Sequence, residues 1–162
     1  MTTPKRAVLV AVHLAALSVL GCSATPFDST PAAGTSAAED PRSDPEPLRQ
    51  YFPIIGAPVA VSWLGRDNSG GRAPGPSIYW IDAVVELQPD TAAALRTRYA
   101  PSESASPPDL PEVLRNRVPA GTYVTGTEFD AALGGAAEWG GSATGYLHTT
   151  RPVLVFTASA GG

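Results

Sequence analysis

One histidine, His148, follows the apolar N-terminal segment of this 162-residue chain. A Ser-His-Asp relay needs such a histidine to take the proton of a nucleophilic serine, and serine, aspartate and glutamate are plentiful here. No serine, however, stands in the Gly-x-Ser-x-Gly pattern of a nucleophile elbow. We therefore expect His148 to be a surface residue of a strand beside a hairpin turn, and a hydrolase that uses His148 is the alternative.

Asp82 and Glu86 lie on the same side of a predicted strand, next to Trp80. Paired carboxylates beside a tryptophan suggest a glycosidase. Four residues along a strand, however, separate two Cα atoms by about 13 Å, which exceeds the separations that either glycosidase geometry uses. The pattern instead predicts a solvated or ion-paired strand face, with Arg96 or Arg98 as candidate partners.

Two loop motifs resemble ligand sites only in part. Asp67, Asn68 and Ser69 are followed by Gly70, but the spacing and the terminal glutamate of a calcium loop are missing. Residues 70–76 are rich in glycine yet lack Gly-Lys-Ser/Thr, and their prolines remove amide donors that a phosphate would need. With one histidine after the N-terminal segment and no spare cysteine, a zinc site is not expected. We predict no metal and no cofactor.

The three tryptophans offer a different chemistry, because an indole combines a large apolar face with one polar N–H group. Trp63 and Trp80 lie in predicted strands and favour core packing. Trp139 precedes two glycines, and both a buried and an exposed position remain open for it. The candidate binding surface comprises Trp139, Trp80, Arg72 and Asp67.

The strongest chemical signal lies at the N-terminus. Lys5 and Arg6 precede an apolar run of about 14 residues, which is too short to span a bilayer. The run ends in Val19-Leu20-Gly21-Cys22, which resembles the lipobox of bacterial lipoproteins, where the thiol receives a diacylglycerol. Cys22 is the only cysteine, so an internal disulfide is impossible and lipidation would use the thiol.

These features predict a signal peptide over residues 1–21 and a lipid on Cys22 that anchors the chain to the outer face of the cell membrane. Two alternatives remain open. Cleavage after Ala24 would give a secreted protein without lipid, and an uncleaved segment would act as a signal anchor.

Residues 22–50 are rich in proline, alanine and serine and contain few large apolar side chains. They predict a disordered tether that would hold a domain on the order of 30 Å from the bilayer. Without Lys5 and Arg6, nine basic side chains remain against 15 acidic ones, a formal charge of about −6. This acidic balance argues against nucleic acid as a partner.

Residues 51–162 predict a single α+β domain: a small antiparallel sheet of about four strands with two or three short helices on one face. Strands are expected over 59–64, 77–87, 143–149 and 152–159, and helices over 91–99, after Asp109 and over 128–133. The apolar side of 77–87 is expected to meet Leu95, Tyr99 and Leu114.

The lipobox, the segment 74–85 and the segment 118–123 together resemble small exported lipoproteins of actinobacteria. The resemblance covers most of the mature domain. It implies export and a lipid anchor, and it transfers no activity and no site residue. The sequence therefore favours a non-catalytic interaction or accessory module that contacts an envelope protein or ligand, with an envelope hydrolase using His148 as the alternative.

Overall fold

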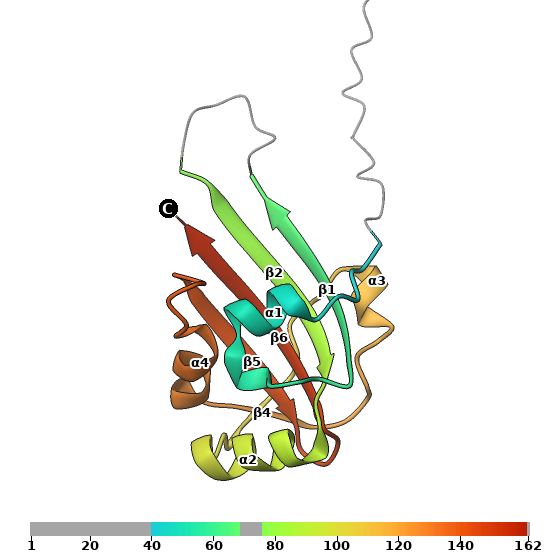
Figure 1. Cartoon of the computed structure of the whole chain (residues 1–162). Coiled ribbons are helices and arrows are strands. Elements are labelled where there is room, and N and C mark those ends of the chain that lie inside the picture. The colour runs from blue at the N-terminus through green and yellow to red at the C-terminus, as the bar shows by residue number, and fades with distance from the viewer. Residues whose placement is uncertain (1–39, 69–75, 162) are drawn as a thin grey trace, which may run out of the picture. The chain divides into compact units, whose positions relative to one another are not determined.

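The computed structural model describes residues 40–68 and 76–161. They form an α+β domain on one antiparallel sheet, which confirms the predicted class (Figure 1). In order across the sheet, the strands are β1 (Ala60–Asp67), β2 (Ile78–Glu86), β6 (Val153–Gly161), β5 (Ser142–His148), β4 (Tyr123–Thr125) and β3 (Glu103–Ala105). The four long strands lie where they are predicted, and the short β3 and β4 add two to the expected number.

Alternation along β2 explains why the sheet has a core side. Ile81, Ala83 and Val85 are buried on one face, where they pack with side chains from β1, β5 and β6. Since successive side chains of a strand point to opposite faces, the intervening Trp80, Asp82 and Val84 lie on the other face. The prediction of one core face and one mixed face is confirmed.

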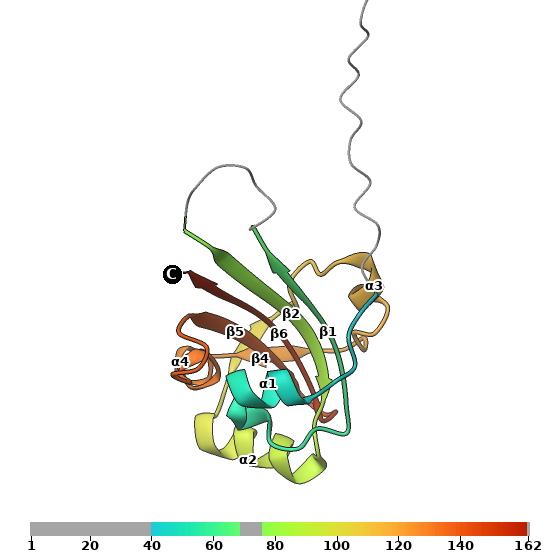
Figure 2. The ribbon, with the colours of Figure 1, turned by 45° about the horizontal axis from the view of Figure 1, so that its top comes forward.

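Three helices and a 3-10 turn contribute to the larger core cluster: α1 (Glu46–Tyr51), η1 (Pro53–Ile55), α2 (Pro89–Tyr99) and α4 (Thr127–Gly134). Helix α1 lies in front of the strands in both views (Figures 1 and 2). Phe52, between α1 and η1, is fully buried, and its ring centroid lies 4.7 Å from that of Phe156 and 5.2 Å from that of Trp139. These contacts join the N-terminal helix to the sheet.

The opposite face has a smaller core of its own. Helix α3 (Glu112–Arg115) brings Leu114 into a cluster with Leu64, Val84, Tyr123 and Val155. Leu114 therefore does not share a cluster with Leu95, and the prediction that all helices lie on one face is wrong for α3. The physical reason is that Leu64, Val84 and Val155 form a second apolar patch that also needs a cover.

The folded chain begins before residue 51, where the tether is predicted to end. The backbone of Arg42 pairs with that of Trp63 in both directions, at 2.8 and 3.0 Å. Pro47 stands in the first turn of α1, where a proline costs no hydrogen bond, and Leu48 is fully buried. The proline content of this segment thus belongs partly to a helix start, which corrects the predicted boundary.

None of the helices within the described ranges is long and apolar enough to cross a membrane. The signal segment, Cys22 and most of the predicted tether lie outside the described residues, as does Arg72.

Candidate functional site

Polar side chains collect at one end of the face that carries α3. In the strand register, Arg66, Trp80, Ser159 and Ser142 form one row across β1, β2, β6 and β5. The next row brings Leu64, Asp82, Thr157 and Thr144 side by side. Because residues paired across strands point to the same side, both rows share one face.

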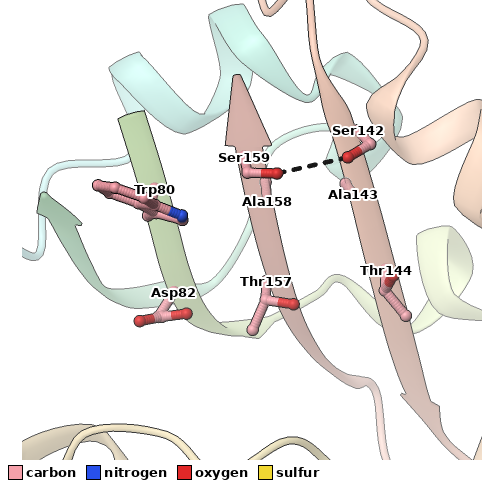
Figure 3. Close-up of a pocket in the computed structure, with 8 residues that line it drawn as sticks. All are labelled: Trp80, Asp82, Ser142, Ala143, Thr144, Thr157, Ala158 and Ser159. Carbon is pink, nitrogen blue, oxygen red and sulfur yellow. Dashed lines mark hydrogen bonds between the residues drawn. The ribbon is translucent and has the colours of Figure 1, made fainter. Parts of the chain in front are cut away.

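These rows surround a shallow depression of about 190 Å³, the polar hollow. Its lining residues are Trp80, Asp82, Ser142, Ala143, Thr144, Thr157, Ala158 and Ser159. Figure 3 shows Trp80 and Asp82 on β2, Thr157 and Ser159 on the neighbouring strand β6, and Ser142 and Thr144 on the following strand β5. The hollow therefore combines one aromatic face, one carboxylate and four hydroxyl groups.

Asp82 is the unusual member of this set, since a carboxylate is rarely buried without a partner. It is 6% exposed and forms an ion pair with Arg66, one row further along β1. Burial raises the pKa of the Asp82 carboxyl above its ordinary value, and the charge and hydrogen bond of Arg66 lower it part of the way back. Arg66 itself is half exposed. The predicted ion-paired face is present, but with Arg66 in place of Arg96 or Arg98.

Trp80 has the exposed indole of the chain's three tryptophans, so the expectation of core packing is confirmed for Trp63 and wrong for Trp80, because Trp80 points to the face opposite the larger core. It is 36% exposed, whereas Trp63 and Trp139 are 3% and 8% exposed. A large aromatic side chain that stays in contact with water at a hollow is a common feature of binding surfaces. Trp80 lines the hollow, and its indole nitrogen points towards the neighbouring strand β6 (Figure 3).

The four hydroxyl groups form a grid on β5 and β6. The Oγ atoms of Ser142 and Ser159 lie 3.5 Å apart and share one hydrogen bond. Thr144 and Thr157 form the row below and are partly exposed. Hydroxyl groups donate and accept equally well, so the grid can bind any ligand that presents alternating donors and acceptors.

A second depression, the aromatic groove, lies at the same end of the sheet and extends from the face that carries α1 to Arg66 and Trp80 on the other face. It measures about 640 Å³, and its aromatic lining residues are Tyr51, Trp63, Tyr79, Trp80 and Trp139. The guanidinium of Arg42 lies 4.0 Å from the Trp63 ring centroid. Glycine at position 65 leaves room for that ring, because a Cβ there would lie 3.1 Å from it.

Three of the four residues of the predicted binding surface, Asp67, Trp80 and Trp139, line this groove. Trp139 nevertheless belongs to the core. Its Nε1 donates to the carbonyl of Ser142 at 3.2 Å, and its ring lies 5.7 Å from that of Tyr51. The choice left open between a buried and an exposed Trp139 is settled in favour of the buried one.

Both ring nitrogens of His148 face backbone groups, an arrangement that does not favour proton transfer to a substrate. Its Nδ1 accepts backbone N–H groups from Thr150 and Arg151 at 3.2 and 3.1 Å, so Nε2 carries the proton and faces the carbonyl of Ala120 at 3.3 Å. The ring is buried, so the expectation of a surface position is wrong. A Cβ on Gly121 would lie 2.3 Å from Nε2. Both nitrogens are thus engaged with the backbone, and the geometry gives no support to a catalytic role.

The remaining candidates for chemistry do not converge. Glu86 is exposed at the far end of β2, two rows away from Asp82. Within the described ranges, no group of three or more His, Cys, Asp or Glu side chains is arranged to hold a metal ion. Asp67 lines the aromatic groove, and Ser69 and Gly70 of the same loop motif lie outside the described residues.

Comparison of the chain with protein-family models, with curated proteins and with solved structures gives no match.

Arg66 and the hydroxyl grid are absent from the sequence-based candidates. The available signal was the spacing of two residues between Ser142 and Thr144 and between Thr157 and Ser159, but it shows that the two pairs share a face only once the register of β5 and β6 is known.

Proposed function

We propose that this protein is a non-catalytic binding module held on the outer face of a bacterial cell membrane by a lipid on Cys22, and that it binds its ligand in the polar hollow. The lipobox and the single cysteine support the anchor. The resemblance to small exported lipoproteins supports the same location.

The observation that carries the binding proposal is the Asp82–Arg66 pair beside the exposed Trp80. A buried carboxylate contributes little to stability, because the loss of its hydration offsets the attraction of its partner. Apolar side chains fill the other end of the same face. Apolar residues at this end would therefore stabilise the fold at a lower cost of desolvation. Costly polar groups next to an exposed aromatic are characteristic of functional sites.

The non-catalytic part of the proposal rests on the hydrogen bonds of His148 and on the partners of the polar groups in the hollow. The histidine is engaged at both nitrogens by backbone groups. The carboxylate of the hollow is paired with a guanidinium, and its neighbours are hydroxyls without a base beside them. This set can recognise a ligand, but it lacks the nucleophile and base of a hydrolase.

The anchor is tested by the intact mass of the protein extracted from the membrane fraction of an actinobacterial host. A mass that starts at Cys22 and includes diacylglycerol supports it. A soluble species that starts after residue 24 replaces the anchor with plain secretion. A Cys22→Ser variant is the matched control and should leave the membrane fraction.

Binding is tested by sedimentation of the purified full-length protein with protein-free cell-wall material from an actinobacterium. We expect the wild type to sediment and Trp80→Ala to stay in solution. Tyr79→Ala is the matched control, since Tyr79 is 49% exposed and points to the other face of the same strand. Equal sedimentation of wild type and Trp80→Ala, or none by either, rejects the polar hollow as the binding site.

A further inference from the structure

We infer that the ligand of the polar hollow is a neutral saccharide, with one sugar ring stacked on the indole of Trp80. The inference rests on the proposed function and names the ligand class for the same site. It follows from the charge, the spacing and the depth of the hollow.

The charge of the hollow favours an uncharged ligand. Asp82 and Arg66 compensate each other, and the other lining side chains are neutral. An anion would meet the Asp82 carboxylate, and a cation would have to compete with Arg66 for it. A ligand that offers hydroxyl groups can instead donate to the second oxygen of Asp82 without separating the pair.

The spacing of the polar groups suits a sugar ring. Neighbouring strands are about 4.8 Å apart, and residues two positions apart on one strand are about 6.7 Å apart. Ser142, Thr144, Thr157 and Ser159 therefore mark the corners of a cell of that size. A pyranose ring carries its hydroxyl groups around its edge at comparable separations.

Trp80 supplies the second half of this recognition. A pyranose has apolar C–H faces above and below the ring, and an indole face is apolar with a negative quadrupole that attracts C–H groups. The indole lies on the same side of the sheet as the hydroxyl grid (Figure 3). One ring could thus stack on Trp80 while its edge hydroxyls reach Ser159 and Asp82.

The depth of the hollow determines how much of the ligand is enclosed. Its volume of about 190 Å³ is below the roughly 300–1,000 Å³ of pockets that enclose small molecules. A shallow site of this kind binds one unit of a longer chain. This fits a glycan of the envelope better than a free cofactor.

The test uses the full-length protein in a polyoxyethylene detergent, which has no sugar headgroup to compete. The probes are cellotetraose, mannotetraose and chitotetraose, with tetragalacturonate as the anionic comparison. Since Trp80 is the exposed indole, we expect a bound neutral probe to protect part of the tryptophan fluorescence from iodide quenching.

Ligand-observed saturation-transfer NMR then compares the variants. We expect Trp80→Ala to weaken binding of the neutral probe at least tenfold and Asp82→Ala to weaken it severalfold. Trp80→Phe keeps an aromatic face and should restore part of the affinity, while Tyr79→Ala should bind as the wild type does. Near-UV circular dichroism confirms that each variant is folded.

Three results would overturn the inference. They are a lack of binding by all neutral probes, a preference for tetragalacturonate, and equal binding by wild type and Trp80→Ala. If no saccharide binds while sedimentation with cell-wall material still depends on Trp80, the proposed function stands and the ligand belongs to another class. If sedimentation is also independent of Trp80, both proposals fail together.

Discussion

The aromatic groove and the polar hollow lie at the same end of the sheet and share Trp80, yet their other residues are used differently. Trp63 and Trp139 line the groove but are almost fully buried, and their contacts hold α1 and β5 to the core. Trp80 and Asp82 line the hollow, where one is exposed and the other is a paired charge. The groove is larger, but size does not identify the functional surface here.

The comparison teaches that the buried tryptophans of the groove belong to the core, whereas the hollow contains groups that the core does not need. This difference is tested most strongly by removing each side chain and measuring the stability of the fold and the binding. Truncation of a buried groove residue such as Trp139 should lower stability, whereas truncation of a residue that lines the hollow should weaken binding instead.

The largest difference is expected between Trp139→Ala and Trp80→Ala. Loss of the Trp139 side chain should lower the free energy of unfolding by about 3–5 kcal/mol, because it leaves a cavity beside Phe52. Loss of the partly exposed Trp80 should cost less than about 1 kcal/mol. Urea unfolding followed by far-UV circular dichroism measures both. Similar costs for the two variants would remove the distinction between groove and hollow.

His148→Ala should produce the next largest effect, a loss of about 2–3 kcal/mol. The substitution leaves the amides of Thr150 and Arg151 without their acceptor and removes the ring that packs against Tyr123 at 4.9 Å between centroids. Binding to cell-wall material should be unchanged in the fraction that remains folded. Loss of binding from a variant of unchanged stability would instead revive a functional role for this histidine.

The strand positions and the fold class could be predicted because alternation is a local pattern. The segment with Tyr79, Ile81, Ala83 and Val85 indicates a strand with one apolar face, and the structure confirms it. The position of Leu114 could not be predicted, because a short helix with one buried leucine fits either face.

The candidate site was predicted only in part for a related reason. Trp80 could be singled out by residue type, whereas the partner of Asp82 depends on the register between β1 and β2, which places Arg66 diagonally across from it. The burial of Trp139 depends on Phe52 and Tyr51, which lie near a boundary that the proline pattern placed too late. Long-range contacts, not local propensity, decide these positions.

The Asp82–Arg66 pair predicts a pH dependence of stability. Since the pKa of Asp82 is raised in the folded state, protonation favours folding. The contribution of this group is most favourable below the unfolded value of about 3.8 and is lost as the pH rises through the higher folded value. Asp82→Asn should therefore be at least as stable as the wild type at pH 7, with its advantage shrinking as the pH falls towards 4.

Arg66→Ala is the matched variant of the same pair. It leaves the buried carboxylate without its partner and should cost about 1–3 kcal/mol at pH 7. The cost should diminish in acid, where Asp82 is protonated. Thermal unfolding between pH 4 and pH 8 compares the two variants with the wild type. An Asp82→Asn variant that is much less stable than the wild type at pH 7 would show that the carboxylate serves the fold, and the argument for a binding role would lose its basis.

Gly65→Ala should have the smallest effect and acts on the groove alone. The added Cβ would lie 3.1 Å from the Trp63 ring, which has to shift by a few tenths of an ångström, and the expected cost is below about 1 kcal/mol. Residue 65 points to the face that carries α1, whereas Trp80 and Asp82 point to the other face. Sedimentation with cell-wall material should therefore not change. A strong loss of binding with this small change in stability would place the ligand in the groove, because only there does the new methyl group occupy space that a ligand could use.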